Sequence, residues 1–429
     1  MYTTKPISKE REKAFLVTVT QYGKEELDLA GRIDEFETLA SSCGAVIAGS
    51  EVCRIKEIKP NLFIGTGKAE EIAGKASELK ADSVIFNNDL SPSQQKNLGE
   101  KFNVKTIDRT QLILDVFARR ATSLEGKVQV ELAQLMYLLP RLSRLWLHFS
   151  KQAGGIGTRG PGEQQLEVDR RKVRERISRL KKELSEITRQ RGVQRSRRER
   201  FSMLSVALVG YTNSGKSTLF NAVTAAKVKT KDQFFSTLDP TVRKKHLPNN
   251  QVILLSDTVG FLNDLPHHLI ESFKATLEEV KGADILFHVV DMSDSRIGEK
   301  MGAVMQVLND ISASDKPIFT ILNKSDIVPA GPQTERIKRK FPGSVVVSAL
   351  KKEGLSAIDD ILMRYIDKDM EDMEIVLPPG HYSVAAVIRE KGEVRFEEYR
   401  DEGLFLHARV PKKMKRQIFK TLGASGIDH

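Results

Sequence analysis

The feature that most constrains this sequence is a phosphate-loop pattern, G-x-x-x-x-G-K-S, from Gly210 to Ser217. It follows an apolar run at 206–209, as a loop does on leaving a buried strand. The two glycines let successive backbone N–H groups point into one concavity, and the helix that follows adds its positive end. Lys216 would reach the β- and γ-phosphates, and Ser217 offers a hydroxyl to Mg²⁺. A chance match is the alternative in a chain of 429 residues, so further motifs must decide.

A second motif, D-x-x-G, begins at Asp257 after an apolar run at 252–255. Asp257 can hold Mg²⁺ through water, and the Gly260 N–H can meet the γ-phosphate. Between the two motifs, in segment 234–241, the Thr237 hydroxyl can complete the Mg²⁺ shell, so that loss of the γ-phosphate releases the segment. Thr241 is the alternative, because sequence alone does not fix which hydroxyl faces inward. We therefore predict metal ligands Ser217, Thr237 and Asp257, and catalytic residues Lys216, Thr237 and Gly260.

A third motif, N-K-x-D from Asn323 to Asp326, selects the base. The Asp326 carboxylate can accept the N1–H and the 2-amino group of guanine, a donor pair that adenine lacks. A predicted strand at 344–347 leads to Ser348-Ala349-Leu350, whose backbone can contact the guanine O6. Four motifs in this order predict a site for GTP and GDP. Its predicted contacts are Gly210, Tyr211, Thr212, Asn213, Ser214, Gly215, Lys216, Ser217, Thr218, Phe235, Ser236, Thr237, Leu238, Asp239, Asp257, Thr258, Val259, Gly260, Asn323, Lys324, Ser325, Asp326, Ser348, Ala349 and Leu350.

The positions after Gly260 shape the expected chemistry. Phe261 and Leu262 stand where many small GTPases have the Gln that orients the attacking water. An apolar side chain cannot do this, so we expect slow GTP hydrolysis by the free protein and a partner that supplies or orders the missing group. The Asn213 amide oxygen could help hold a monovalent cation, K⁺, between β- and γ-phosphate oxygens, in place of an arginine finger.

The net charge of +11 is concentrated in one part of the chain. Residues 111–200 contain 21 Lys and Arg against 10 Asp and Glu, an excess equal to the net charge of the whole protein. Such a concentration indicates a polyanionic partner for this part, since each neutralised phosphate releases counterions. A solvated basic helix is the alternative.

Composition also excludes some classes of protein. No apolar run approaches the ~20 residues of a membrane span. Residues 1–13 are charged and lack the apolar core of a signal peptide, which predicts a cytoplasmic protein. Cys43 and Cys53 are too few for a disulfide framework or a structural zinc site, and we interpret them as ordinary buried thiols.

The first part of the chain, residues 1–108, alternates predicted strands and helices. Strands are expected at 15–20, 45–48, 62–64, 83–86 and 104–107, and helices at 34–42, 69–79 and 91–102. This alternation predicts a largely parallel α/β sheet. Gly65-Thr66-Gly67-Lys68 lies at a strand-to-helix junction. Because the remaining phosphate-loop spacing is missing, a tight turn with a helix-leading lysine is favoured over a second nucleotide site.

Residues 109–200 show heptad spacing on two predicted helices, which favours an antiparallel helical hairpin. The apolar positions are Leu132, Leu135, Leu139, Leu142, Leu145 and Phe149, then Leu166, Val173, Ile177, Leu180, Leu184 and Ile187. Pro140 should kink or divide the first helix. The tip, residues 151–163, suits close approach to an RNA backbone, although a plain flexible loop is the alternative. Its proposed RNA contacts are Gly154, Gly155, Gly157, Arg159, Gly160 and Gly162.

The remainder divides into a nucleotide domain at 201–368 and a small α+β domain at 369–429. In the latter, residues 377–380 resemble a linker, strand-like stretches lie at 382–389, 393–399 and 404–410, and a basic helix begins near Lys412. The predicted fold class is therefore α/β, with a P-loop GTPase domain after an α/β subdomain and a helical hairpin. We expect the chain to act as a monomer.

With these residues in view, nearly the whole chain resembles the HflX family of translational GTPases, within the Obg/HflX group. The most specific stretches are GGIGTRGPGEQQLEVDRR at 154–171 and EGKVQVELAQL at 125–135, supported by FSTLDP at 235–240 and DTVGF at 257–261. The resemblance implies a hairpin tip that enters the peptidyl-transferase region of the large ribosomal subunit. It also implies GTP-dependent binding to that subunit and splitting of stalled ribosomes under stress.

Two other functions compete with this one. A GTPase of this architecture could act in ribosome assembly or RNA metabolism instead of on mature ribosomes. It could also be a structural RNA-binding arm with a vestigial nucleotide domain, but the intact Lys216, Ser217, Asp257 and Asp326 argue against that.

Overall fold

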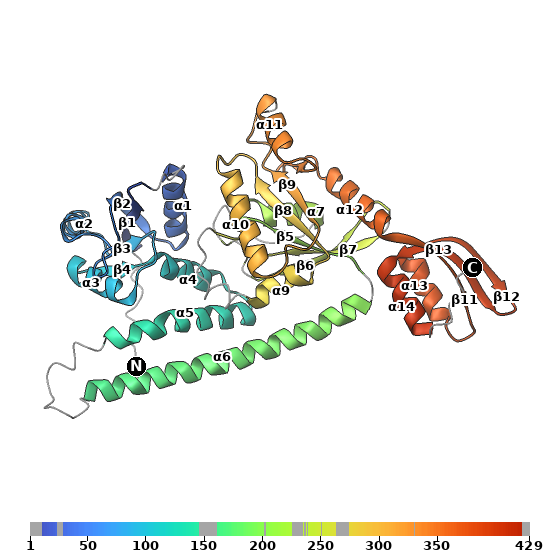
Figure 1. Cartoon of the computed structure of the whole chain (residues 1–429), viewed down its shortest axis with the longest axis horizontal. Coiled ribbons are helices and arrows are strands. Elements are labelled where there is room, and N and C mark those ends of the chain that lie inside the picture. Colours follow the sequence, from blue (N-terminus) through green and yellow to red (C-terminus); the bar gives the residue numbers. More distant parts are fainter. Residues whose placement is uncertain are drawn as a thin grey trace.

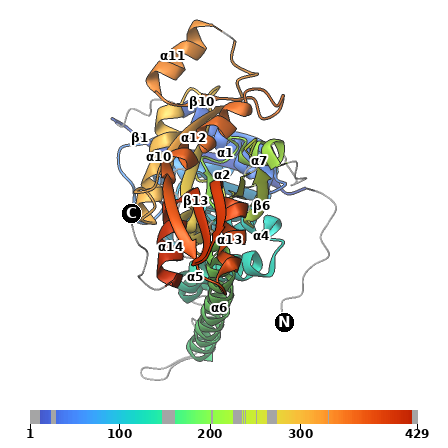
Figure 2. The same cartoon turned by 90° about the vertical axis from the view of Figure 1, so that its right-hand side faces the viewer.

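The computed structural model describes residues 11–23, 29–145, 161–200, 203–224, 235, 237, 239–249, 251–262, 274–329 and 331–422. Three sheets follow one another along the molecule, and a long helical hairpin runs beneath the first two in the view of Figure 1. Figure 2 looks nearly along the hairpin and shows it projecting below the sheets. The expected class, an α/β protein with a hairpin and a small α+β unit at the end, is confirmed.

The first sheet is parallel throughout, with strand order β2-β1-β3-β4. Its strands are β1 (Lys13–Gln21), β2 (Val46–Ile55), β3 (Ser83–Phe86) and β4 (Lys105–Ile107). Its helices are α1 (Leu29–Ser42), α2 (Thr66–Glu78), α3 (Pro92–Phe102) and α4 (Arg109–Arg120). Residues 14–20 of β1 are all buried, as a parallel strand covered on both faces requires.

One predicted strand in this part is wrong. Residues 62–64 form a turn in which the Ile64 N–H donates to the Leu62 carbonyl at 2.6 Å and Phe63 has a φ of +64°. The three side chains are apolar because they are buried under α2, not because they join the sheet. Lys68, in the first turn of α2, lies 2.6 Å from Glu51 and 2.7 Å from Glu71, so two carboxylates already engage its ammonium group.

The hairpin consists of α5 (Leu124–Leu145) and α6 (Pro161–Arg200), which run antiparallel (Figure 1). Leu132 and Leu180 are fully buried between them, joined by Val128, Leu135, Met136, Ile177 and Leu184, so this part of the predicted apolar seam is confirmed. α5 is not divided at Pro140.

The end of the hairpin differs from the predicted tip in one respect. α6 begins at Pro161, a residue suited to the first helical turn, so Gly162 belongs to the helix and not to the connection. Gly154, Gly155, Gly157, Arg159 and Gly160 lie outside the described residues.

The second sheet has the order β10-β9-β8-β5-β7-β6, and β6 is the one strand that pairs antiparallel. Its strands are β5 (Ser205–Val209), β6 (Thr241–His246), β7 (Val252–Asp257), β8 (Ile285–Asp291), β9 (Ile318–Asn323) and β10 (Val345–Val346). The associated helices are α7 (Lys216–Thr224), α9 (Lys274–Gly282), α10 (Ile297–Asp310), α11 (Pro332–Lys340) and α12 (Ser356–Asp369). Ligands of such sheets bind at the carboxyl ends of the strands, where the predicted motifs lie.

The last part is a three-stranded antiparallel sheet of order β11-β13-β12, with two helices over one face. The elements are β11 (Met370–Leu377), α13 (Tyr382–Lys391), β12 (Glu393–Arg400), β13 (Gly403–Pro411) and α14 (Lys412–Leu422). Residues 382–389 are therefore helical, and the predicted strand is wrong. Ala385 and Ile388, three residues apart, pack on the sheet as a helical face. The supposed linker at 377–380 is instead the end of β11 and a turn with Gly380 at φ +101°.

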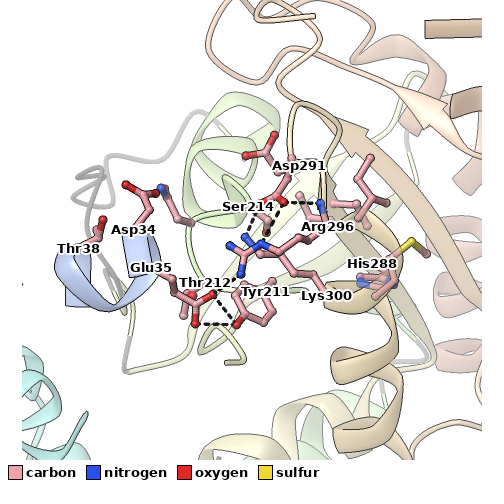
Figure 3. A pocket seen from close by; sticks show the side chains of 16 residues that line it. Asp34, Glu35, Thr38, Tyr211, Thr212, Ser214, His288, Asp291, Arg296 and Lys300 are labelled. Carbon is pink, nitrogen blue, oxygen red and sulfur yellow. Dashed lines mark hydrogen bonds and ion pairs between the residues drawn. The ribbon is translucent and has the colours of Figure 1, made fainter. Parts of the chain in front are cut away.

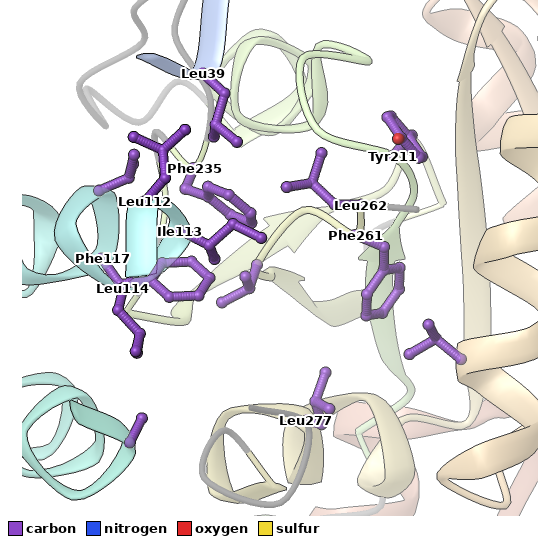
Figure 4. Packing of buried hydrophobic residues seen from close by; sticks show 14 of the residues in the cluster. Leu39, Leu112, Ile113, Leu114, Phe117, Tyr211, Phe235, Phe261, Leu262 and Leu277 are labelled. Carbon is purple, nitrogen blue, oxygen red and sulfur yellow. The ribbon is translucent and has the colours of Figure 1, made fainter. Parts of the chain in front are cut away.

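A single apolar cluster joins the first part of the chain to the nucleotide part. Leu39 of α1 and Leu112 and Phe117 of α4 pack with Phe235, Phe261, Leu262 and Leu277 from the second part (Figure 4). The ring of Phe117 meets the ring of Phe235 edge-on, with centroids 4.3 Å apart. Segments around the predicted nucleotide site are thereby buried against α1 and α4.

Candidate nucleotide-binding site

The phosphate loop leaves β5 and turns into α7. Gly210 has a φ of +153°, and a Cβ there would lie 2.3 Å from the Val289 carbonyl oxygen. Gly215 has a φ of +88°, and a Cβ there would lie 2.2 Å from the Asn323 amide nitrogen. Both positions therefore require glycine, as the sequence pattern suggests.

Lys216 lies inside this loop with its ammonium group buried. Its Nζ donates to the carbonyl oxygens of Gly210 at 3.1 Å and Tyr211 at 2.8 Å. Burial lowers the pKa of Lys216 to about 8, although the nearby Asp257 carboxylate acts in the opposite direction. A buried cation whose hydrogen bonds to described residues go to carbonyl oxygens is suited to receive an anion.

Three oxygen-bearing side chains meet beside Lys216. The Ser217 and Thr237 hydroxyls lie 2.7 Å apart, and the Thr237 hydroxyl donates to Asp257 Oδ2 at 2.9 Å. Asp257 is fully buried, and its Oδ1 atom has no hydrogen-bond partner among the described residues. Burial raises the pKa of Asp257. A buried carboxylate with one unmatched oxygen beside two hydroxyls is the donor set that Mg²⁺ prefers.

Thr241 lies elsewhere. It is the first residue of β6, where it pairs with Asp257 in the antiparallel ladder. The structure brings the Thr237 hydroxyl, and not that of Thr241, into hydrogen-bonding distance of Ser217.

The D-x-x-G segment is held against the phosphate loop by backbone bonds. The Thr212 N–H donates to the Phe261 carbonyl at 2.8 Å, and the Phe261 N–H donates to the Gly210 carbonyl at 3.1 Å. A Cβ at Gly260 would lie 2.9 Å from Thr212 Cα and 3.0 Å from Lys216 Nζ. Gly260 therefore lies where a γ-phosphate on Lys216 would be in reach of its backbone.

The two motifs predicted to bind guanine, N-K-x-D and Ser348-Ala349-Leu350, are also in contact. Asn323 donates to the Ser214 carbonyl at 2.9 Å and accepts from the Ala349 N–H at 3.0 Å, so it ties the phosphate loop to the last motif. The Ser348 hydroxyl donates to Asp326 Oδ1 at 2.6 Å and orients the carboxylate. Lys324, at φ +63°, forms an ion pair with Asp291 at 2.8 Å.

These motifs enclose a cavity of about 370 Å³. It is lined by Thr212, Asn213, Gly215, Lys216, Ser217, Thr218, Phe235, Thr237, Thr258, Gly260, Asn323, Lys324, Asp326, Ile327, Ala349 and Leu350. Ile327 was missed by the sequence analysis, although it directly follows the N-K-x-D motif. Ser236 and Leu238 lie outside the described residues. Gly210, Asp257, Val259, Ser325 and Ser348 lie beside the cavity but do not line it, and Ser214 instead lines a second, smaller cavity.

Two predicted contact residues direct their side chains away from this cavity. The Tyr211 hydroxyl lies 3.0 Å from both carboxylate oxygens of Glu35 on α1, in a smaller cavity of about 220 Å³ (Figure 3). Asp239 instead accepts hydrogen bonds from Thr122 and Ser123 at the start of α5. No nucleotide motif includes Glu35, Thr122 or Ser123, so the sequence pattern gives no signal for them.

Family models and relatives agree on one family. Models described as GTP-binding GTPase N-terminal, GTP-binding GTPase Middle Region and 50S ribosome-binding GTPase match residues 30–118, 120–198 and 205–324. A GTPase HflX from Lacrimispora saccharolytica is 41% identical, covering 95% of each chain. The GTPase HflX of Escherichia coli is 40% identical, covering 95% of this chain and 96% of its own. The chain belongs to the HflX family of GTPases.

As an HflX-family GTPase, the protein binds guanine nucleotide and hydrolyses GTP, and its nucleotide domain is of the ribosome-binding kind. The predicted resemblance is thereby confirmed. Throughout the part of the chain that the structure describes, no helix has the length and hydropathy needed to cross a membrane.

Proposed function

We propose that this GTPase binds the large ribosomal subunit through its hairpin when GTP is bound, and separates the subunits of stalled ribosomes. The observation that carries the proposal is the exposed positive charge of α6, a helix of 40 residues. The proposed division of labour assigns nucleotide binding to 201–368, RNA binding to 109–200, and support or docking to 1–108 and 369–429. A ribosomal partner is consistent with the expected cytoplasmic location.

The charge on α6 is available to a partner. Between residues 167 and 190, where side chains are described, the exposed basic residues are Arg171, Lys172, Arg174, Arg176, Arg179, Lys181, Lys182 and Arg189. Arg176 forms a two-pronged ion pair with Glu131 on α5, at 2.7 and 2.8 Å, and so helps to join the two helices. Arg171 also lies 4.0 Å from Glu175. Residues 167–190 nevertheless contain nine Lys and Arg against five Asp and Glu, and this excess of positive charge favours RNA phosphates as the partner.

The site chemistry follows from the residues around the cavity. Asp326, oriented by Ser348, would select guanine, and Lys216 would hold the β- and γ-phosphates. Ser217, Thr237 and Asp257 would hold Mg²⁺, which neutralises charge on the phosphate oxygens. The Gly260 N–H would meet the γ-phosphate. Lys216, Thr237 and Gly260 are therefore our proposed catalytic residues.

The side chains that follow Gly260 cannot orient water. Phe261 and Leu262 are 2% and 1% exposed and belong to the apolar cluster beneath the site. We therefore propose that hydrolysis is slow in the free protein and is completed by the ribosome. Asn213, at φ +60° on the rim of the cavity, is the proposed ligand for K⁺, and replacement of K⁺ by Na⁺ should slow hydrolysis if this assignment holds.

Charge reversal on α6 tests the role of the hairpin. Arg171→Glu with Arg174→Glu should weaken binding to purified large subunits and reduce its dependence on salt, while GTP affinity stays unchanged. Glu37→Lys and Asp360→Lys, which change surface charge outside the hairpin, form the control pair. Equal loss of binding in the control pair, or none in the α6 variant, would contradict the proposal.

Light scattering separates subunit splitting from the alternative role in ribosome assembly. Associated ribosomes mixed with the protein and a non-hydrolysable GTP analogue should lose scattering as the subunits part. Binding to free large subunits without any loss of scattering would instead favour the assembly role.

A further inference from the structure

We propose that Asp239 is a positioning residue that couples Thr237 at the nucleotide site to the base of the hairpin. The inference rests on the proposed function of Thr237 as a metal ligand. It adds that the Asp239 contact transmits the difference between bound GTP and bound GDP from Thr237 to α5. It concerns three residues, Phe235, Thr237 and Asp239, each of which contacts a different part of the molecule.

Asp239 contacts the junction between α4 and α5. Its Oδ2 atom accepts from the Thr122 N–H at 3.2 Å, the Thr122 hydroxyl at 2.7 Å and the Ser123 N–H at 2.8 Å. The Ser123 hydroxyl donates to Oδ1. Burial raises the pKa of Asp239, but the bonds from Ser123 and Thr122 outweigh it and leave the pKa below its usual value.

The four donors belong to the start of the hairpin. Ser123 immediately precedes α5, and its hydroxyl also accepts from the Gly126 N–H at 2.9 Å, as a helix-capping residue does. A Cβ at Gly126 would lie 2.4 Å from Asp239 Oδ1, so the carboxylate is in close contact with the first turn of the helix. Asp239 thus adds a negative charge at the amino end of α5, where the helix dipole favours it.

Phe235 holds the other end of this short segment. It is 2% exposed, has a φ of +52°, and packs edge-on against Phe117 of α4. A left-handed backbone costs a non-glycine residue about 1 kcal/mol, so the ring contact must stabilise it. Both ends of the segment are therefore attached to α4 and its junction with α5.

Thr237 lies between these two attachments and faces the opposite way, toward Ser217 and Asp257. Because Thr237 is two residues from each attachment, we infer that a backbone shift that withdraws it from the oxygen cluster strains the Phe235 contact or the Asp239 contact. Coupling of this kind is reciprocal. Nucleotide that retains Thr237 stabilises the hairpin base, and a partner that displaces the hairpin base weakens the hold on GTP.

The test uses the full-length protein without ribosomes, so its result does not depend on large-subunit binding. Asp239→Asn should lower affinity for a GTP analogue with Mg²⁺ about tenfold, the effect of losing hydrogen bonds to a charged group at a partly exposed site, and should leave GDP affinity unchanged. Thr122→Val, which alters only the hairpin side, should act in the same direction by about threefold. Unchanged GDP affinity shows that the variants fold.

Thr110→Val is the matched control, because it removes a hydroxyl bond to Asp89, 2.6 Å long, near the opposite end of α4 from Phe117 and without contact to Thr122 or Ser123. It should leave the ratio of the two affinities unchanged. Hydrogen exchange of the amides at 122–126 supplies a second readout: they should be better protected with the GTP analogue than with GDP, and Asp239→Asn should abolish the difference.

Thr237→Ala distinguishes the proposed coupling through Asp239 from the assignment of Thr237 as a metal ligand, on which the coupling rests. If Thr237→Ala weakens the GTP analogue but Asp239→Asn and Thr122→Val do not, the coupling is wrong and the metal-ligand assignment stands. If Thr237→Ala has no effect, both are overturned. Equal losses for GTP analogue and GDP in Asp239→Asn would also overturn the coupling.

Discussion

The hydroxyl of Tyr211, inside the phosphate loop, lies 3.0 Å from both carboxylate oxygens of Glu35, a residue 176 positions earlier in the chain. Glu35 is 7% exposed and also faces Arg109 at 3.4 Å and Arg296 at 3.5 Å. Helices α1 and α4 of the first part therefore meet the nucleotide part at a buried, charged contact that includes the phosphate loop itself (Figure 3).

Glu35→Ala should destabilise this contact strongly. It leaves two buried guanidinium groups without their shared carboxylate, a change that costs about 3 kcal/mol or more in buried ion pairs. Urea unfolding should show the loss, whereas Glu37→Ala on the same helix should change stability by less than about 1 kcal/mol. A similar small effect for both variants would mean that the Glu35 contact contributes little to stability.

Asp326→Asn should change the base preference. The amide can still accept the N1–H, but its NH₂ group faces the 2-amino group of guanine. GTP affinity should fall about 100-fold, as expected when bonds to a charged group are lost. Xanthosine triphosphate, which has a carbonyl at that position, should bind better than GTP. Asp360→Asn, an exposed change in the same domain, is the control. If Asp326→Asn still prefers GTP to xanthosine triphosphate, the assignment of Asp326 as the guanine-selecting residue is wrong.

Lys216 should take up a proton when nucleotide binds. Its pKa of about 8 in the free protein lies below the ordinary value because of burial, so the group is partly neutral near pH 8.5. Phosphate should raise this pKa. Calorimetry of GDP binding in buffers of different ionisation enthalpy should detect more proton uptake at about pH 8.5 than at about pH 6.5, where the lysine is already charged.

The lowered pKa of Lys216 also sets how the stability of the nucleotide-free protein changes with pH. A lysine whose folded pKa is lowered destabilises the nucleotide-free protein fully below pH 8, and this cost disappears as pH rises from about 8 to about 10.4. In the calorimetry experiment, the same proton release or uptake at about pH 8.5 and at about pH 6.5 would contradict the lowered pKa of Lys216.

Arg141→Ala should detach α5 from the first sheet. The Arg141 guanidinium lies 2.9 Å from the buried Asp108 carboxylate, donates to Gln95, and stacks 3.5 Å from the centre of the Tyr137 ring. Loss of a buried pair should cost about 3 kcal/mol. Arg176→Ala, which removes an exposed pair, should cost less than about 1 kcal/mol. Thermal unfolding compares the two, and equal shifts would argue against an anchoring role.

Much of the nucleotide site was predictable because its chemistry is local in sequence. Each motif follows an apolar run, and parallel strands deliver their carboxyl ends to one edge, so Lys216, Asp257 and Asn323 had to meet. The side chains that leave the cavity could not be foreseen. Tyr211 and Asp239 sit within motifs, but their partners Glu35 and Thr122 lie more than 100 residues away and carry no recognisable pattern.

The errors in the fold have a similar origin. Residues 382–389 contain several β-branched side chains, yet they form a helix whose Ala385 and Ile388 side chains pack on the sheet, with Val384 and Val387 partly buried beside them. Residues 62–64 are as apolar as a strand, yet Phe63 pairs with Lys59 in an isolated bridge instead of joining the sheet. Local composition indicated burial correctly in both places but not the element that was buried.

The most direct test of the whole account is co-sedimentation of the full-length protein with purified large ribosomal subunits, in GTP analogue and in GDP. We expect much tighter binding with the GTP analogue, and loss of that preference in Asp239→Asn. Equal binding with the two nucleotides, or no binding to the large subunit, would contradict it.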